Sequence, residues 1–199
     1  MQMNISTLRT VALCLAASMS VSAMATVKGE AVFSEDFSAE DSFRKWTIVD
    51  NNGGRTWEYL NGMAAYMLDY DYDKGEPGER PGDDWLISPE FTLESGKVYD
   101  LRLYVGSLSK KENLRICIGK TDDPASMATV VADFKDMVKE QSGDKVFRLA
   151  MPEGGTYRLG FYAYSEPKQH RVESDNVEIT DAGSDKAPGP VEGLTAVRG

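Results

Sequence analysis

The chain is poor in the two residue types that most often mark redox, metal or catalytic chemistry. It has two cysteines, Cys14 and Cys117, and a single histidine, His170. We expect Cys14 to be removed with an N-terminal segment, which leaves Cys117 alone and excludes an intrachain disulfide. Cys117 lies in a strand-like run and is expected to be a buried, inert thiol, since a nucleophilic thiolate needs a nearby base. His170 is expected in a solvated loop, because metal sites and catalytic triads need several converging partners.

Basic residues are scarce relative to acidic ones. The 199 residues include 22 Lys and Arg against 32 Asp and Glu, for a net charge of −10. This balance argues against nucleic acid and anionic membranes as partners, since both require basic patches. An acidic exported protein instead suits a calcium-containing medium. The sequence has no phosphate loop, Gly-x-Ser-x-Gly elbow or His-Glu-x-x-His motif, although two of its carboxylates could in principle form a glycosidase pair.

The longest run of apolar or small residues is too short to span a bilayer, which takes roughly 20 residues. This run, residues 11–24, follows Arg9 and ends in the small-x-small sequence Ala-Met-Ala at 23–25. The layout predicts a secretory signal peptide over residues 1–25 rather than a transmembrane anchor. We therefore expect a secreted or surface-displayed protein without membrane insertion.

The rest of the chain alternates strand-like runs with turn sequences and has almost no helical periodicity. The dipeptide Asn61-Gly62 predicts a hairpin with a type I′ turn. Residues 123–127 are the one stretch expected to form a short helical turn, with Pro124 near its start. The pattern predicts about eleven strands, at residues 31–38, 46–50, 55–60, 63–69, 85–93, 97–106, 113–119, 128–135, 145–151, 156–164 and 171–180.

Two of these runs alternate cleanly between apolar and polar faces. The residues that share the expected buried faces are Tyr99, Leu101, Leu103 and Val105 in one run, and Tyr157, Leu159, Phe161 and Ala163, opposite Arg158, Gly160, Tyr162 and Tyr164, in the other. One dry and one wet face per strand is what two packed antiparallel sheets require. The sequence therefore predicts an all-β jelly-roll β-sandwich of two antiparallel sheets over residues 26–180, with a closed barrel as the alternative.

Two stretches differ in composition from the strand pattern. Residues 69–82 form a long acidic excursion, rich in Gly and Pro, between two expected strands. Residues 181–190 have the composition of a linker. The segment that follows, 191–199, resembles the opening strand of a fibronectin type III domain, so this chain could belong to a longer multidomain protein.

Period-two phase places a carboxylate on the apolar side of the first and last expected strands. Glu35 shares a face with two phenylalanines, and Asp175 shares one with a valine and an isoleucine. A buried carboxylate without a partner costs several kcal/mol, so each needs a cation. If the two strands are neighbours, the carboxylates meet, and calcium satisfies both better than one arginine can. The alternative is that they are half solvated and pair with Arg44 or Arg171.

Several segments occur in the order typical of one extracellular family. They are Phe33-Ser34-Glu35-Asp36-Phe37, Trp46-Thr47-Ile48-Val49-Asp50, Arg55-Thr56-Trp57, Asp84-Trp85-Leu86-Ile87-Ser88-Pro89, Gly160-Phe161-Tyr162-Ala163-Tyr164 and Ser174-Asp175-Asn176-Val177-Glu178-Ile179. Over residues 30–180 the chain resembles the cleaved-adhesin or choice-of-anchor J domains, which include the adhesin modules of gingipains. The resemblance implies a jelly roll similar to galactose-binding-like modules, with structural calcium, on a secreted or surface protein.

The predicted calcium ligands are Glu35, Asp36, Asp50 and Asp175. The loop that begins at Asp50 could add oxygens, but it lacks the spacing and the terminal Glu of an EF-hand. It carries two asparagines where the resembling family is richer in Asp and Gly, which would weaken calcium binding there. The family's last strand usually has two adjacent acids, whereas here Asp175 is followed by asparagine.

The aromatic residues divide into two groups. The three tryptophans, Trp85 among them, lie in strand patterns and are expected in the core. Tyr70 and Tyr72 lie in the acidic excursion, where a ring could stack on a sugar while nearby acids accept hydroxyl protons. We expect Tyr70, Tyr72 and Asp83 to contact a ligand; the alternative is a solvated loop whose tyrosines cover the edge of the sandwich.

These observations favour a secreted or surface-exposed, non-catalytic binding or adhesion module. Its expected ligand is a host protein, a glycan or another domain of a longer chain, bound through loops at one edge of the sandwich. The alternative is a carbohydrate-binding module that serves a secreted glycosidase or peptidase. A hydrolase in its own right is the third hypothesis.

Overall fold

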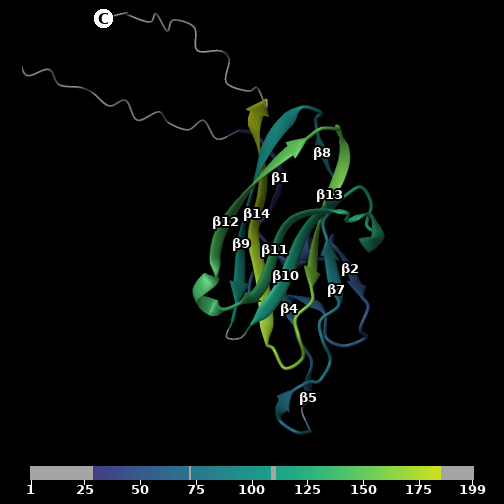
Figure 1. The fold of residues 1–199 in the computed structure, drawn as a ribbon, viewed down its shortest axis with the longest axis vertical. Helices are drawn as coiled ribbons and strands as arrows, with labels where there is room; N and C mark the ends of the chain where they lie inside the picture. The colour runs from purple at the N-terminus through teal and green to yellow at the C-terminus, as the bar shows by residue number, and fades with distance from the viewer. Residues whose placement is uncertain (1–28, 72, 109–110, 185–199) are drawn as a thin grey trace, which may run out of the picture.

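A computed structural model describes residues 29–71, 73–108 and 111–184. The expected signal peptide, Tyr72 and residues 185–199, which hold most of the expected linker and the fibronectin-like segment, lie outside the described residues. The described chain forms two six-stranded antiparallel sheets packed face to face (Figure 1). The predicted jelly-roll β-sandwich is confirmed. Each sheet ends in edge strands, which excludes a closed barrel.

The first sheet, called sheet 1, contains the first and last strands of the domain. Its members are β1 (Ala31–Glu35), β3 (Trp57–Leu60), β4 (Met63–Met67), β9 (Lys97–Ser107), β12 (Gly143–Met151) and β14 (Arg171–Ser184). The order is β12-β9-β14-β4-β3, and β1 also pairs with β14. First and last strands are therefore neighbours, as predicted.

The second sheet, called sheet 2, lies against the inner face of sheet 1. Its members are β2 (Thr47–Asp50), β7 (Asp84–Ile87), β8 (Phe91–Leu93), β10 (Glu112–Gly119), β11 (Thr129–Met137) and β13 (Gly155–Ala163). The order is β11-β10-β13-β7-β2, and β8 also pairs with β13. The edge strands β11 and β12 lie on the same side of the sandwich, where the Phe134 and Phe147 rings meet at 6.2 Å.

The inner faces of the two sheets form one apolar core. The residues predicted to share the buried faces of β9 and β13 are buried, which confirms the alternation. Trp46 and Trp57 are core residues as expected, and their rings lie 5.7 and 6.4 Å from the ring of Phe161. Cys117 is also buried, and burial raises the pKa of its thiol. Burial of this large apolar surface is the main stabilising contribution to the fold.

Two local predictions are confirmed by backbone geometry. Asn61 and Gly62 both have positive φ, at 51° and 81°, as a type I′ turn between β3 and β4 requires. Pro124 opens η1 (Pro124–Ser126), where the Asp123 side chain accepts a hydrogen bond from the Ala125 N–H.

Other elements differ from the predicted pattern. The one-turn helix α1 (Glu40–Phe43) and the 3-10 turn η2 (Lys139–Gln141) are too short to show periodicity, and the first is held by the burial of Phe43 and by the Ser42 hydroxyl, which donates to Glu35. The acidic excursion contains a small ribbon, β5 (Tyr70–Asp71) with β6 (Glu76–Pro77), at the lower tip in Figure 1. Residues 181–184, assigned to the linker by composition, continue β14 because they pair with β9. No helix in the described ranges is long and apolar enough to cross a membrane.

Candidate binding face and carboxylate cluster

The outer face of sheet 2 carries a column of stacked aromatic rings. Trp85 in β7 lies directly opposite Tyr162 in β13, and their ring centroids are 4.6 Å apart with planes 18° from parallel. Tyr164, just past the end of β13, stacks on the other face of the Tyr162 ring, with centroids 5.3 Å apart and planes 13° from parallel. The guanidinium of Arg115 lies 5.1 Å from the centroid of the Tyr164 ring. We call these four side chains the aromatic column.

The position of Trp85 corrects the expectation that all three tryptophans lie in the core. Its neighbours Asp84 and Leu86 point inward and are fully buried, so strand alternation turns the indole outward. Gly160 leaves room for it, because a Cβ at Gly160 would lie 3.1 Å from the indole and 2.9 Å from the Met127 sulfur. The indole therefore rests on a hollow in the sheet that a larger residue would fill.

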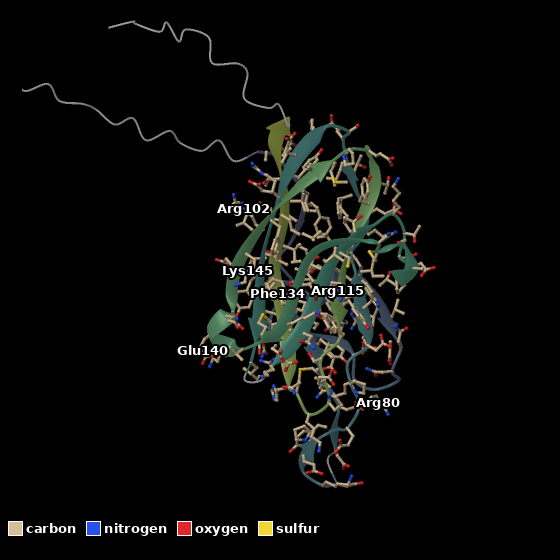
Figure 2. All side chains as sticks on the ribbon, viewed as in Figure 1. Arg80, Arg102, Arg115, Phe134, Glu140 and Lys145 are labelled. Atoms are coloured by element: carbon tan, nitrogen blue, oxygen red, sulfur yellow. The ribbon has the colours of Figure 1, made fainter. Side chains whose placement is uncertain are left out.

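Carboxylates hold the hydroxyl edges of the aromatic column. The Tyr162 hydroxyl donates to Asp83 at 2.9 Å, and the Tyr164 hydroxyl donates to Asp133. Arg115, labelled in Figure 2, also donates to Asp133, at 3.2 Å. Burial, followed by the effect of the neighbouring carboxylate, raises the pKa of each tyrosine to about 12. Both phenols therefore remain neutral donors at physiological pH.

This arrangement is suited to binding polar, hydroxyl-rich ligands rather than to catalysis. The rings cover one another's faces, so the column presents half-buried ring edges. Beside those edges lie two fixed carboxylates and one guanidinium, which bind hydroxyls through charge-assisted hydrogen bonds. Because each polar group is already held by a neighbour, little side-chain entropy is lost when a ligand binds.

Of the residues on this face, the sequence analysis predicted only Asp83 as a ligand contact. Asp83, predicted to contact a ligand, lies at its rim and also accepts a hydrogen bond from Asn51 at 3.4 Å. The outward positions of Tyr162 and Tyr164 were visible in the alternation of β13. Their proximity to Asp133 depends on the order of β11, β10 and β13 in the sheet, which alternation does not reveal.

Tyr70 lies apart from Asp83, in the ribbon of β5 and β6. It is 42% exposed and lines an open polar hollow of about 870 Å³ together with Asp71, Lys74 and Arg80. Arg80 pairs with Asp69 at 3.3 Å in the same hollow. Tyr70 and Asp83, both predicted to contact a ligand, therefore lie on two different surfaces.

Glu35, Asp36 and Asp175 form a carboxylate cluster where β1 meets β14. Glu35 accepts hydrogen bonds from the Phe37 N–H and the Ser42 hydroxyl, both at 2.7 Å. Burial, together with the charges of Asp36 and Glu35, raises the pKa of the Asp175 carboxyl. The charged form of Asp175 is therefore disfavoured at this position, whereas hydrogen bonds from Ser38 lower the pKa of the Asp36 carboxyl.

The arginine partners considered as the alternative are engaged elsewhere. Arg44 pairs with Glu40 at 2.7 Å, and Arg171 pairs with Glu173. In the described part of the chain, no Lys or Arg forms an ion pair with the carboxylate cluster.

The backbone beside the carboxylate cluster is unusual on both strands. Phe37 and Asn176 have positive φ values of 45° and 51°, a conformation that asparagine tolerates but that is costly for a bulky residue such as phenylalanine. Asn176 lies in a register shift of β14, so strict alternation cannot be counted through it. Counting in twos from Val177 and Ile179 was therefore not a valid way to assign the face of Asp175, although Asp175 does lie near Glu35.

The fourth predicted calcium ligand is placed elsewhere. Asp50, at the end of β2, accepts a hydrogen bond from the Gly53 N–H at 2.6 Å and lies opposite Asp84 in sheet 2. Among the residues that the structure describes, no set of three or more acidic, histidine or cysteine side chains is spaced to hold a metal. A calcium ion at the carboxylate cluster would therefore need backbone carbonyls or water in addition, which calcium accepts.

Comparison with known proteins gives matches to solved structures alone. No family model matches the chain, and no curated protein matches its sequence. The K3 and K1 cleaved adhesin domains of Lys-gingipain from Porphyromonas gingivalis W83 are each 18% identical, with a TM-score of 0.59. The K3 alignment covers 76% of this chain and 98% of the other, and the K1 alignment 78% and 100%. The likeness is one of fold.

A carbohydrate-binding module has a similar fold. This module, the CBM1 of BiXyn10A in its apo form, is 15% identical with a TM-score of 0.50, and the alignment covers 76% of this chain and 98% of the other. The sandwich is thus shared with an adhesin module and a carbohydrate-binding module.

Proposed function

We propose that this protein is a non-catalytic binding module that takes a glycan on the outer face of sheet 2. The observation that carries the proposal is the aromatic column, whose hydroxyl edges are held by Asp83 and Asp133. The half-buried ring edges offer apolar contact to the C–H groups of a sugar, and the fixed carboxylates and guanidinium beside them bind its hydroxyls. The fold likeness to a carbohydrate-binding module supports this assignment.

The same proposal includes export and structural calcium. The N-terminal sequence supports secretion or surface display through a cleaved signal peptide. The carboxylate cluster supports calcium, since no Lys or Arg among the residues that the structure describes pairs with it and calcium is the cation best suited to several oxygens. Calcium bound there would tie β1 to β14 and so stabilise the domain.

Two arginines on opposite sheets provide a matched test of the glycan site. Arg115 and Arg102 both lie on outer strand faces and pair with an aspartate, Asp133 and Asp100 respectively (Figure 2). A glycan array should first identify a ligand for the exported chain, and calorimetry should then compare the variants. We expect Arg115→Met to weaken binding at least about tenfold, or about 1.4 kcal/mol, and Arg102→Met to leave it unchanged. Equal affinities in the two variants would place the ligand elsewhere.

A second candidate is adhesion to a host protein through the ribbon of β5 and β6. The exposed Tyr70 ring beside the charged hollow favours it, because tyrosines are enriched at protein interfaces. Tyr70→Ala distinguishes the two functions. Its glycan affinity should equal that of the wild type if the aromatic column is the site, and a loss of protein adhesion in this variant alone would favour the second candidate.

A further inference from the structure

An apolar groove opens on the side of the sandwich where both sheets end. It lies between the edge strands β11 and β12, which are neighbours at the front of the molecule in Figure 1. Its volume is about 570 Å³. The apolar residues that line it are Ile118, Val130, Val131, Leu149, Met151 and Tyr157. This groove is separate from the aromatic column, which lies on the outer face of sheet 2.

The edge strand that borders the groove is protected over only half of its length. Its second half carries charges at Asp133, Lys135 and Asp136, which discourage pairing with another strand. The first half, residues 129–132, is uncharged, and there Val130 is 52% exposed. An exposed, uncharged half-strand beside an apolar groove is a surface to which an extended segment can add.

The charged residues on the rim of the groove are already paired. Lys120 pairs with Glu153 at 3.2 Å, and Arg148 pairs with Asp100 at 3.0 Å. A charged ligand would have to break these pairs, whereas an uncharged apolar segment leaves them intact. The expected occupant is therefore apolar and extended.

We propose that the groove is the docking surface for residues 191–197 of the same chain. Ser184 and Met151 both lie opposite Lys97, on either side of β9, so they are two strand spacings, or about 10 Å, apart. Crossing from sheet 1 to sheet 2 adds about 10 Å. Residues 185–190 span about 20 Å when extended, which brings the next residues to the groove.

The composition of residues 191–197 matches the groove. The segment holds two valines and Leu194, its largest apolar side chain, with a single charged residue, Glu192. Docked there as a strand, the segment turns Leu194 and Ala196 toward the groove, with Glu192 at one end of the same face, while the backbone pairs with residues 129–132. The direction in which the chain leaves the domain is then fixed by the sandwich.

Hydrogen exchange on the exported chain, residues 26–199, tests this docking. Val130 and Val146 provide a matched pair, since both are edge-strand valines, 52% and 54% exposed, and only Val130 lines the groove. We expect protection at residues 191–197 and at those amides of residues 129–132 that point away from β10, independent of protein concentration. Leu194→Asp and Val130→Asp should each speed exchange in both segments at least about tenfold, and Val146→Asp should not.

Three results would overturn the proposal. The first is free exchange at residues 191–197 in the wild-type chain. The second is protection at residues 129–132 that rises with protein concentration, which would indicate a second copy in the groove. The third is protection at the amides of 129–132 that point away from β10, if it survives Leu194→Asp or needs an added partner. Leu194 is not among the core residues of the described sandwich, so its variant decides the matter even if Val130→Asp does not fold.

Discussion

The indole of Trp85 and the phenol of Tyr162 stack on the outside of the sandwich at 4.6 Å between centroids. The two residues lie opposite each other on neighbouring strands, so the pairing of β7 with β13 fixes the contact. Tyr162 is held on its other face by Tyr164 and at its hydroxyl by Asp83. A ring with neighbours on both faces and at its edge has little rotamer freedom left. The face is therefore preorganised, which favours binding over a surface that must order first.

The Tyr162 phenol is expected to titrate abnormally. Burial and then the Asp83 carboxylate raise its pKa to about 12, so Asp83→Asn should lower that value toward the unperturbed value of about 10. Because the pKa of the Tyr162 phenol is raised in the folded state, the neutral phenol contributes its full stabilisation below about pH 10. This stabilisation is lost as the pH rises through about 12. NMR titration of labelled tyrosine measures the shift. Asp181→Asn, which alters a carboxylate of β14 paired with Lys97, is the control and should leave the Tyr162 pKa unchanged.

Gly160 is expected to be intolerant of even one added methyl group. A Cβ there would lie 2.9 Å from the Met127 sulfur and 3.1 Å from the Trp85 indole. Gly160→Ala should lower the free energy of unfolding by about 1–3 kcal/mol, the usual effect of overpacking, and should weaken the near-ultraviolet circular dichroism of the stacked rings. Met127→Ala in the same chain should restore part of the loss. A fully stable Gly160→Ala protein with unchanged dichroism would show that the indole does not rest on Gly160.

The fold was predictable because its signals are local. The Asn61-Gly62 turn needs only the two residues that form it, and the burial of Leu101 and Leu103 follows from alternation within one strand. The side of the sheet taken by Trp85 was not predictable, because a large aromatic residue suits either face and only the small residue beneath it, Gly160 on another strand, makes room for it.

The candidate sites depend on contacts that no local pattern contains. Tyr164 reaches Asp133 only because β10 places β11 beside β13. Asp175 lies beside a register shift, where counting in twos fails. The proximity of Glu35 and Asp175 was nevertheless predictable, since it required only that the first and last strands pair.

Asp84 is expected to be the most costly carboxylate to remove. It is fully buried and accepts hydrogen bonds from the Asn51 N–H at 3.0 Å and from the Asn52 side-chain amide at 3.5 Å. Asp84→Ala removes this acceptor from the Asn51 N–H, which keeps its 3.3 Å bond to the Asp83 carbonyl, and from the Asn52 amide, and should lower the free energy of unfolding by about 1–3 kcal/mol. Urea denaturation measures the change, with Asp50→Ala, an exposed neighbour in the same strand pair, expected to cost less. Equal losses in the two variants would contradict the structural importance of Asp84.

Calcium and the Asp175→Asn substitution are expected to act in opposite directions on the carboxylate cluster. In chelator, the Asp175 charge is unfavourable, as its raised pKa indicates, because it is partly buried near Asp36 and Glu35. Asp175→Asn should therefore raise the melting temperature of the calcium-free protein. With calcium at 100 times its Kd, the wild-type chain should gain about 2.7 kcal/mol, and the variant should gain less because it has lost one carboxylate ligand.

Asp181→Asn separates this effect from a general loss of charge. Asp181 lies on β14, as Asp175 does, and its ion pair with Lys97 of β9 at 2.9 Å is lost in the variant, so Asp181→Asn should lower stability equally with and without calcium. Thermal unfolding of the three proteins in chelator and in calcium gives the comparison. If wild-type protein melts at the same temperature in both buffers, no calcium is bound, and the carboxylate cluster must then be tolerated as a strained feature of the pairing between β1 and β14.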